Sequence, residues 1–179
     1  MADLSDLINR FNGLVHEMIS TREQESIIIA KDTMALIRNR IQNDKVDSNG
    51  QEFGQYSDAV VPQWMLYGRS LSDGAEEKIK KGDWFQSYSD LREANNLQTD
   101  AIDFTFSGDT MRNTGVTEVS NTNFSTSVTL GGQTTRASSI LGYQEPRHGN
   151  IITPSEAEIK LVREAHEERV NKLIQKFLQ

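Results

Sequence analysis

Two histidine–glutamate pairs are the first residues in this 179-residue chain whose spacing could support catalysis. His16-Glu17 and His166-Glu167 each begin like the zinc-binding helix of a metalloprotease, which carries a second histidine four positions after the first. Ser20 and Val170 hold those positions. Neither pair can therefore bind zinc in this way, and we expect His166 to pack on an apolar helix face.

A second pattern resembles the first half of a calcium-binding EF-hand loop. Asp47, Asn49 and Gly50 occupy the third, fifth and sixth places of a loop that would run from Lys45 to Tyr56. Lysine stands where the first ligand should be, and tyrosine replaces the glutamate that closes the cage. We expect neither a metal nor a cofactor, and we interpret Gly50 as a tight-turn residue with positive φ.

The remaining catalytic signatures are absent from the sequence. It contains no phosphate-binding glycine loop and no Gly-x-Ser-x-Gly turn, and it has no cysteine that could act as a nucleophile or a thiolate ligand. Carboxylates are plentiful, but no pair stands in an apolar setting that would separate two pKa values. A hydrolase using Asp103 and Asp109 is a third hypothesis; we expect a protein without catalysis.

The charge balance excludes further classes of function. The chain carries 19 Lys and Arg against 26 Asp and Glu, a net charge of −7, which argues against a sequence-specific nucleic-acid reader. Its longest apolar run, residues 27–30, is far shorter than the roughly 20 residues that cross a bilayer. The acidic N-terminus lacks the basic and apolar regions of a secretory signal. We expect synthesis in the cytoplasm and no membrane association.

Helical spacing dominates the first 44 residues. One apolar stripe consists of Leu4, Leu7, Ile8, Phe11, Leu14, Val15 and Met18. A second stripe runs from Ile27 to Ile41 but does not continue the heptad phase of the first. Ser20 and Glu23 form a capping-box pattern between them, which predicts two helices, or one helix bent near Ser20.

The middle of the chain shifts from irregular to strand-like patterns. Turn-forming residues over 43–50 end the second helical stripe, and residues 45–100 predict an irregular segment with short helices over 75–81 and 84–95. Alternation from Ile102 to Phe106 and two Val- and Thr-rich runs, 116–120 and 124–130, predict a three-stranded antiparallel meander within 101–132.

Helices return at the C-terminal end. A short helix is expected over 135–141, before Gly142, and Pro146 marks the loop after it. Thr153 then offers a cap, with Pro154 at the first position of a helix that runs to residue 179. The chain is thus expected to form one α+β domain, 1–179, in which a helical arm (1–44) and a C-terminal helix (153–179) pack on a small antiparallel meander.

Two stretches carry a resemblance to a known family. The first begins with Arg40-Ile41 and continues through Val46-Asp47-Ser48-Asn49-Gly50 and Phe53 to Tyr56-Ser57. The second is Asp103-Phe104-Thr105-Phe106-Ser107-Gly108-Asp109-Thr110-Met111. Together they resemble the tail-completion and virion-morphogenesis family of tailed phages, the small head–tail joining or neck proteins. The chain departs from that family in having Ser107 for threonine, an extra residue before Met111, a long 56–84 stretch and an added N-terminal helix.

The resemblance implies a structural virion protein. Such a subunit would assemble as a ring of six or twelve copies between portal-side connectors and the tail, and would let double-stranded DNA pass without sequence-specific binding. It would be found in the virion, and in the host cytoplasm during assembly. The alternative is a small phage scaffolding or adaptor protein that acts as a monomer or dimer through its helical stripes.

Several residues are candidates for partner contacts or for the turns that present them. Glycines in turns, aromatic residues in the irregular segment and motif residues make up the set. They are Gly50, Tyr56, Ser57, Trp64, Tyr67, Trp84, Gly108 and Met111. Gly108, like Gly50, is expected at a tight turn with positive φ.

Overall fold

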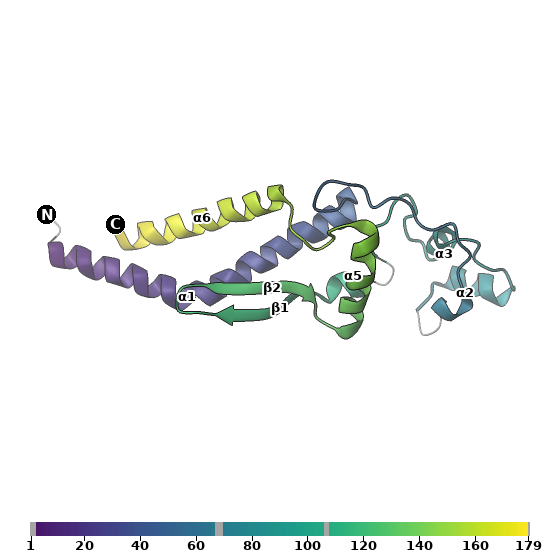
Figure 1. The fold of residues 1–179 in the computed structure, drawn as a ribbon, viewed down its shortest axis with the longest axis horizontal. Coiled ribbons are helices and arrows are strands. Elements are labelled where there is room, and N and C mark those ends of the chain that lie inside the picture. The colour runs from purple at the N-terminus through teal and green to yellow at the C-terminus, as the bar shows by residue number, and fades with distance from the viewer. Residues whose placement is uncertain (1–2, 67–69, 106–107, 179) are drawn as a thin grey trace.

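The computed structural model describes residues 3–66, 70–105 and 108–178, and its fold is α+β with long helices at both ends. Helix α1 (Leu4–Asn39) runs beside α6 (Glu156–Leu178), and a β-hairpin lies along the opposite side of α1 (Figure 1). Helix α5 (Thr135–His148) crosses near the middle, and α2 (Asp73–Lys80) and α3 (Tyr88–Ala94) form the far end. None of the described helices is long and apolar enough to span a membrane.

Helix α1 is one continuous helix whose axis changes direction (Figure 1), so the bent-helix alternative is correct and a new helix start at Ser20 is wrong. The Ser20 hydroxyl donates to the Glu17 carbonyl at 3.0 Å, and the Thr21 hydroxyl donates to the same oxygen at 2.8 Å. Hydroxyl groups that bond back to the preceding turn loosen the backbone ladder and bend helices. These hydroxyls therefore support a bend where a cap was expected.

The end of α1 leads into a tightly held turn. The helix widens into η1 (Arg40–Asp44), a π-helical segment, and Lys45 ends it in the left-handed conformation with φ +59°. Asp47 Oδ1 then accepts from the backbone N–H groups of Asn49 and Gln51 at 2.8 and 2.9 Å. Gly50 has φ +80°, so the expected positive-φ turn is present.

The sheet has two strands. Strand β1 (Thr114–Asn121) pairs antiparallel with β2 (Thr126–Gly132), with a bulge between Val116 and Glu118. The expected third strand over 102–106 is wrong, so the meander is a hairpin; Phe106 lies outside the described residues. Before β1, the single turn α4 (Asp109–Arg112) follows Gly108, whose φ of +74° agrees with the expected turn.

The backbone at Phe104 explains why the alternating 102–105 segment does not form a strand. Phe104 has φ +54°, a left-handed conformation that interrupts the two-residue repeat of a strand. The neighbouring backbone groups bond to side chains instead: Thr105 donates its N–H to Asp103 Oδ1 at 2.9 Å, and its carbonyl accepts from Arg92. Asp103, which alternation placed on the polar side, is buried.

The far end of the molecule has its own apolar cluster. A 3-10 turn, η2 (Gln63–Leu66), precedes α2, which begins two residues before the expected 75–81 helix. Helix α3 begins four residues later than the expected 84–95 helix and ends one residue earlier. The Ser72 and Ser87 hydroxyls cap α2 and α3. The buried members of this cluster are Val61, Leu66, Ala75, Phe85 and Leu91.

Two expectations about the C-terminal third need correction. Helix α5 continues through Gly142 and Pro146 to His148. The proline removes one backbone N–H donor, and the helix ends two residues after it. The cap of α6 is Ser155 rather than Thr153. The Ser155 N–H donates to Glu158 Oε2 at 2.6 Å and its hydroxyl accepts from the Glu158 N–H at 3.2 Å, a reciprocal capping box.

A buried arginine joins these elements around the main core. That core consists of Met34, Ile37, Ile41, Phe53, Met111, Leu141 and Ile151. Beside it, Arg40 Nε donates to Glu158 Oε1 at 2.9 Å, and the same guanidinium donates to the carbonyls of Val46, Ile151 and Thr153. Arg40 thus connects the end of α1, the following turn and the start of α6.

Replacing Arg40 with alanine is expected to destabilise the protein by about 3–5 kcal/mol, because Glu158 is left as a buried charge without its partner. Urea unfolding monitored by circular dichroism measures the change. Lys160→Ala is the matched control, since the Lys160–Glu164 pair on the surface of α6 is exposed and 3.9 Å apart. Equal losses from the two substitutions would contradict the central role of Arg40.

Candidate functional site

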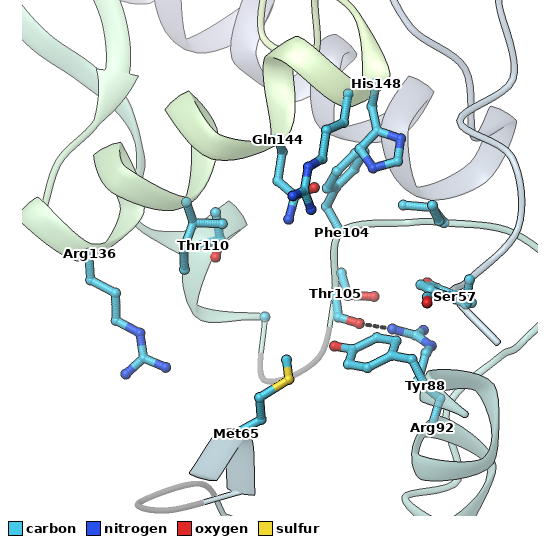
Figure 2. A pocket seen from close by; sticks show the side chains of 15 residues that line it. Ser57, Met65, Tyr88, Arg92, Phe104, Thr105, Thr110, Arg136, Gln144 and His148 are labelled. Carbon is cyan, nitrogen blue, oxygen red and sulfur yellow. Dashed lines mark hydrogen bonds between the residues drawn. The ribbon is translucent and has the colours of Figure 1, made fainter. Parts of the chain in front are cut away.

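A pocket of about 380 Å³ lies between α5 and the loops that lead to the far end of the molecule (Figure 2). One face of α5 forms one wall with Arg136, Ile140, Gln144, Arg147 and His148. The opposite side is made by Tyr56, Ser57, Met65, Tyr88, Arg92, Ile102, Phe104, Thr105, Gly108 and Thr110. The pocket therefore lies where the main core meets the far-end cluster.

A buried network of three side chains supports the loop side of this pocket. The Tyr56 hydroxyl donates to Asp103 Oδ1 at 2.9 Å, and Arg92 donates to Asp103 Oδ2 at 3.1 Å. The Arg92 guanidinium also lies 4.4 Å from the centre of the Tyr56 ring and donates to the Gln98 carbonyl at 2.7 Å. The network ties α3 to the loops on either side of it and keeps these polar groups satisfied.

Burial raises the pKa of both acids in the network, but only for Asp103 do hydrogen bonds reverse the direction of the shift. Burial raises the pKa of Asp103, but hydrogen bonds from Gln98, Thr105 and Tyr56 outweigh it and hold the pKa below its ordinary value. Burial also raises the pKa of the Tyr56 phenol well above its ordinary value. Asp103 is therefore an ionised acceptor near neutral pH, and the phenol keeps its proton.

The mouth of the pocket carries positive charge. Arg136 is exposed and makes no ion pair with any residue in the described ranges, while Arg147 donates to the Tyr143 hydroxyl at 3.1 Å. His148 Nδ1 lies 3.2 Å from the Phe53 carbonyl. This arrangement offers donors to a negatively charged group. A nucleophile hydrogen-bonded to a base does not occur among the pocket's described side chains.

The acidic residues considered for chemistry do not assemble into a site. Both oxygens of Asp103 are engaged by the buried network, and the Asp109 side chain lies outside the described part of the structure. Asp47 is engaged within its own turn. Burial raises the pKa of its carboxyl group, but hydrogen bonds from Gln51 and Asn49 outweigh burial and hold the pKa below its ordinary value. Across the described ranges, no group of three or more acidic or histidine side chains is arranged to hold a metal ion.

The structure separates the candidate contact residues. Tyr56, Ser57 and Gly108 line the same pocket, whereas Gly50 lies in the Asp47 turn. Met111 is buried in the main core. Tyr67 falls outside the described residues.

The two tryptophans differ in their surroundings. The Trp84 indole donates to the Val61 carbonyl at 2.7 Å and packs on the far-end cluster. Trp64 is 69 % exposed and is therefore available to a partner. Of the aromatic residues in the irregular segment, Tyr56 and Trp84 thus fill local structure.

A larger feature is the apolar face of the first half of α1. From here on, the arm means residues 4–19 of this helix, a part of the helical segment 1–44. Seven large apolar side chains there are 40–69 % exposed: Leu4, Leu7, Ile8, Phe11, Val15, Met18 and Ile19. Leu14 alone of the predicted stripe is buried. Beside it, a Cβ at Gly13 would stand only 3.0 Å from the Phe177 ring of α6. Helix α6 therefore covers a different face of α1 and leaves most of the stripe bare.

The hairpin covers the same face of α1 farther along. Arg22 follows Phe11, Val15 and Met18 at helical spacing, so it shares their face. Its guanidinium donates to the carbonyls of Thr122 and Asn123, at the tip of the hairpin. The apolar face is thus covered from Arg22 onward and bare before it.

Sequence reasoning found the stripe but missed what covers it. The spacing of Leu4 to Met18 shows which residues share a face, but it does not show that the hairpin ends at Arg22. The buried partners Arg40 and Arg92 were also missed, because an arginine in a helical pattern has the same signature whether it is buried or exposed. Phe124, which was expected in a strand, is 94 % exposed at the hairpin tip.

Comparisons with known proteins add no relative. No family model, no curated protein and no solved structure matches the chain.

Substituting Asp103 with asparagine is expected to cost about 3 kcal/mol at neutral pH, because Arg92 loses its buried counter-charge. Since the folded pKa of Asp103 is lowered, its stabilisation is present above its unfolded pKa of about 4 and is lost as the pH falls through the folded value. The stability gap between wild type and variant should therefore be constant from about pH 5 to 8 and narrow below about pH 4. Urea unfolding across this range measures it.

Asp100→Asn is the control, because Asp100 pairs with Lys45 while remaining mostly exposed. It should leave the unfolding midpoint nearly unchanged. A gap between wild type and Asp103→Asn that stays constant below pH 4 would show that the Asp103 charge does not stabilise the fold.

Proposed function

We propose that this protein is a non-catalytic structural subunit of a tailed-phage virion, a head–tail connector, neck or tail-completion protein that assembles as a ring. The observation that carries the proposal is the bare apolar face of the arm, with seven large apolar side chains exposed side by side. Exposed apolar faces of this extent mark sites of protein association. In this proposal, another subunit covers the exposed apolar face of the arm.

The distribution of surfaces along the molecule supports a joining role. The arm forms one end, and the far-end cluster with exposed Trp64 forms the other (Figure 1). A subunit with contact surfaces at both ends can meet its own copies at one and neighbouring portal, connector or tail proteins at the other. The phage assignment itself rests on the resemblance of residues 40–57 and 103–111.

Charge supports passage of DNA through such a ring. A net charge of −7 opposes the release of counterions from DNA that basic proteins use to bind it. Double-stranded DNA would therefore cross the ring without sequence-specific binding. The pocket and its network supply positioning and stability in this proposal, and no catalysis is assigned to them.

Native mass spectrometry of the purified protein over a range of concentrations, with negative-stain images of large species, tests the proposal. We expect a closed ring of six or twelve copies, as the resemblance of residues 40–57 and 103–111 implies. A discrete dimer would favour the scaffolding or adaptor alternative. A monomer at every concentration would contradict self-assembly, and counting copies per purified virion would then test incorporation directly.

A further inference from the structure

The bare face of the arm does not end at Ile19, because the hairpin tip extends it. The seven exposed side chains of the arm leave on the order of 700 Å² open, close to the roughly 800 Å² that each partner contributes to a standard interface. Phe124, 94 % exposed, adds an aromatic side chain beyond them. The combined surface is large enough for a stable contact between two copies.

The hairpin tip is held rigidly enough to serve as a contact element. The Thr122 N–H donates to the Ser125 carbonyl at 2.8 Å, and the Ser125 N–H donates to the Thr122 hydroxyl at 2.9 Å. Arg22 holds the carbonyls of Thr122 and Asn123 at 2.7 and 3.1 Å. Phe124 is therefore presented to solvent by a turn already ordered in the single subunit, which lowers the entropy cost of binding through it.

The hairpin also restricts how a second helix can lie on the arm. It stands on the same face of α1 from Arg22 onward. A partner arm running parallel would continue as its own α1 into the space that this hairpin fills. A partner arm running antiparallel instead begins, at its Leu4, beside the hairpin tip. Antiparallel pairing is therefore the orientation that the fold accommodates.

The spacing along the arm agrees with a two-fold axis. Leu4 and Met18 are equally distant from Phe11, and so are Leu7 and Val15. A two-fold antiparallel pair centred on Phe11 therefore places Leu4 opposite Met18 and Leu7 opposite Val15, with the two Phe11 side chains at the centre. Antiparallel helices also place opposite ends of their dipoles together, whereas parallel helices place like ends together.

We propose that the bare face of the arm is occupied by the arm of a second copy of this chain, antiparallel about a two-fold axis near Phe11. Each Phe124 then covers the first apolar residues of the other arm, Leu4 and Leu7. This inference deepens the self-association on which the proposed function rests and names the partner surface. A two-fold contact is used once by each copy, so a ring of six or twelve would contain three or six such pairs, closed through other surfaces.

Replacing Phe11 with aspartate tests the occupied surface. Phe11 is 56 % exposed in the subunit, so the substitution should leave the circular dichroism spectrum and thermal midpoint intact. It should weaken association at least tenfold, measured by sedimentation equilibrium, because a charge would be buried at the centre of the contact. Leu161→Asp is the matched control, a 54 % exposed leucine on α6. Unchanged association of the Phe11 variant, or equal loss in the control, would overturn the proposal.

Engineered cysteines test the orientation, since the chain has none of its own. In the antiparallel pair, Leu4 of one copy lies beside Met18 of the other, while the two Leu4 positions are about 21 Å apart, 14 residues at 1.5 Å each. A mixture of Leu4→Cys and Met18→Cys proteins should form mixed disulfide dimers, and Leu4→Cys alone should remain uncrosslinked. Efficient crosslinking of Leu4→Cys to itself, or no mixed dimer, would overturn the antiparallel arrangement.

These measurements separate the inference from the phage assignment. Antiparallel dimers that never form a ring would contradict the proposed connector and leave the arm pairing intact. A ring that survives Phe11→Asp unchanged would contradict the arm pairing and leave the connector intact.

Discussion

The fold depends on a single guanidinium group that is buried where three segments meet. Arg40 bonds to a carboxylate of α6 and to backbone carbonyls from the turn after α1 and from the segment before α6. A buried cation needs partners on every side, and each partner is thereby fixed in position. Because Glu158 also caps its own helix through Ser155, this ion pair sets both where α6 begins and how it lies on α1.

The length of α1 imposes a second constraint, because the helix is longer than the elements that cover it. The hairpin covers one face from Arg22 onward, and α6 lies on the opposite side of α1 and reaches Gly13. Neither the hairpin nor α6 covers the apolar face that precedes Arg22. A 36-residue helix thus contributes to the core in one half and exposes an apolar face in the other, and its bend falls near the boundary.

Long periodic features were predictable from the sequence, whereas features made by contacts between distant residues were not. The terminal helices, the last two strands and the turns at Gly50 and Gly108 follow from spacing and local chemistry. The prediction of a strand over 102–106 was wrong because Asp103 forms hydrogen bonds with Tyr56 and Arg92, which are 47 and 11 residues away in the sequence. The pocket beside this network also joins residues from separate segments, so spacing within one segment could not reveal it.

The packing of α6 on α1 also orders events in time. The arm is translated before the helix that lies against it at Gly13 and Phe177. Contacts this distant along the chain close late and slow the search for the native state. Until α6 has been translated and has docked, the arm is therefore exposed on two faces rather than one. A holdase chaperone that releases the arm only after α6 has docked would suit this order of folding.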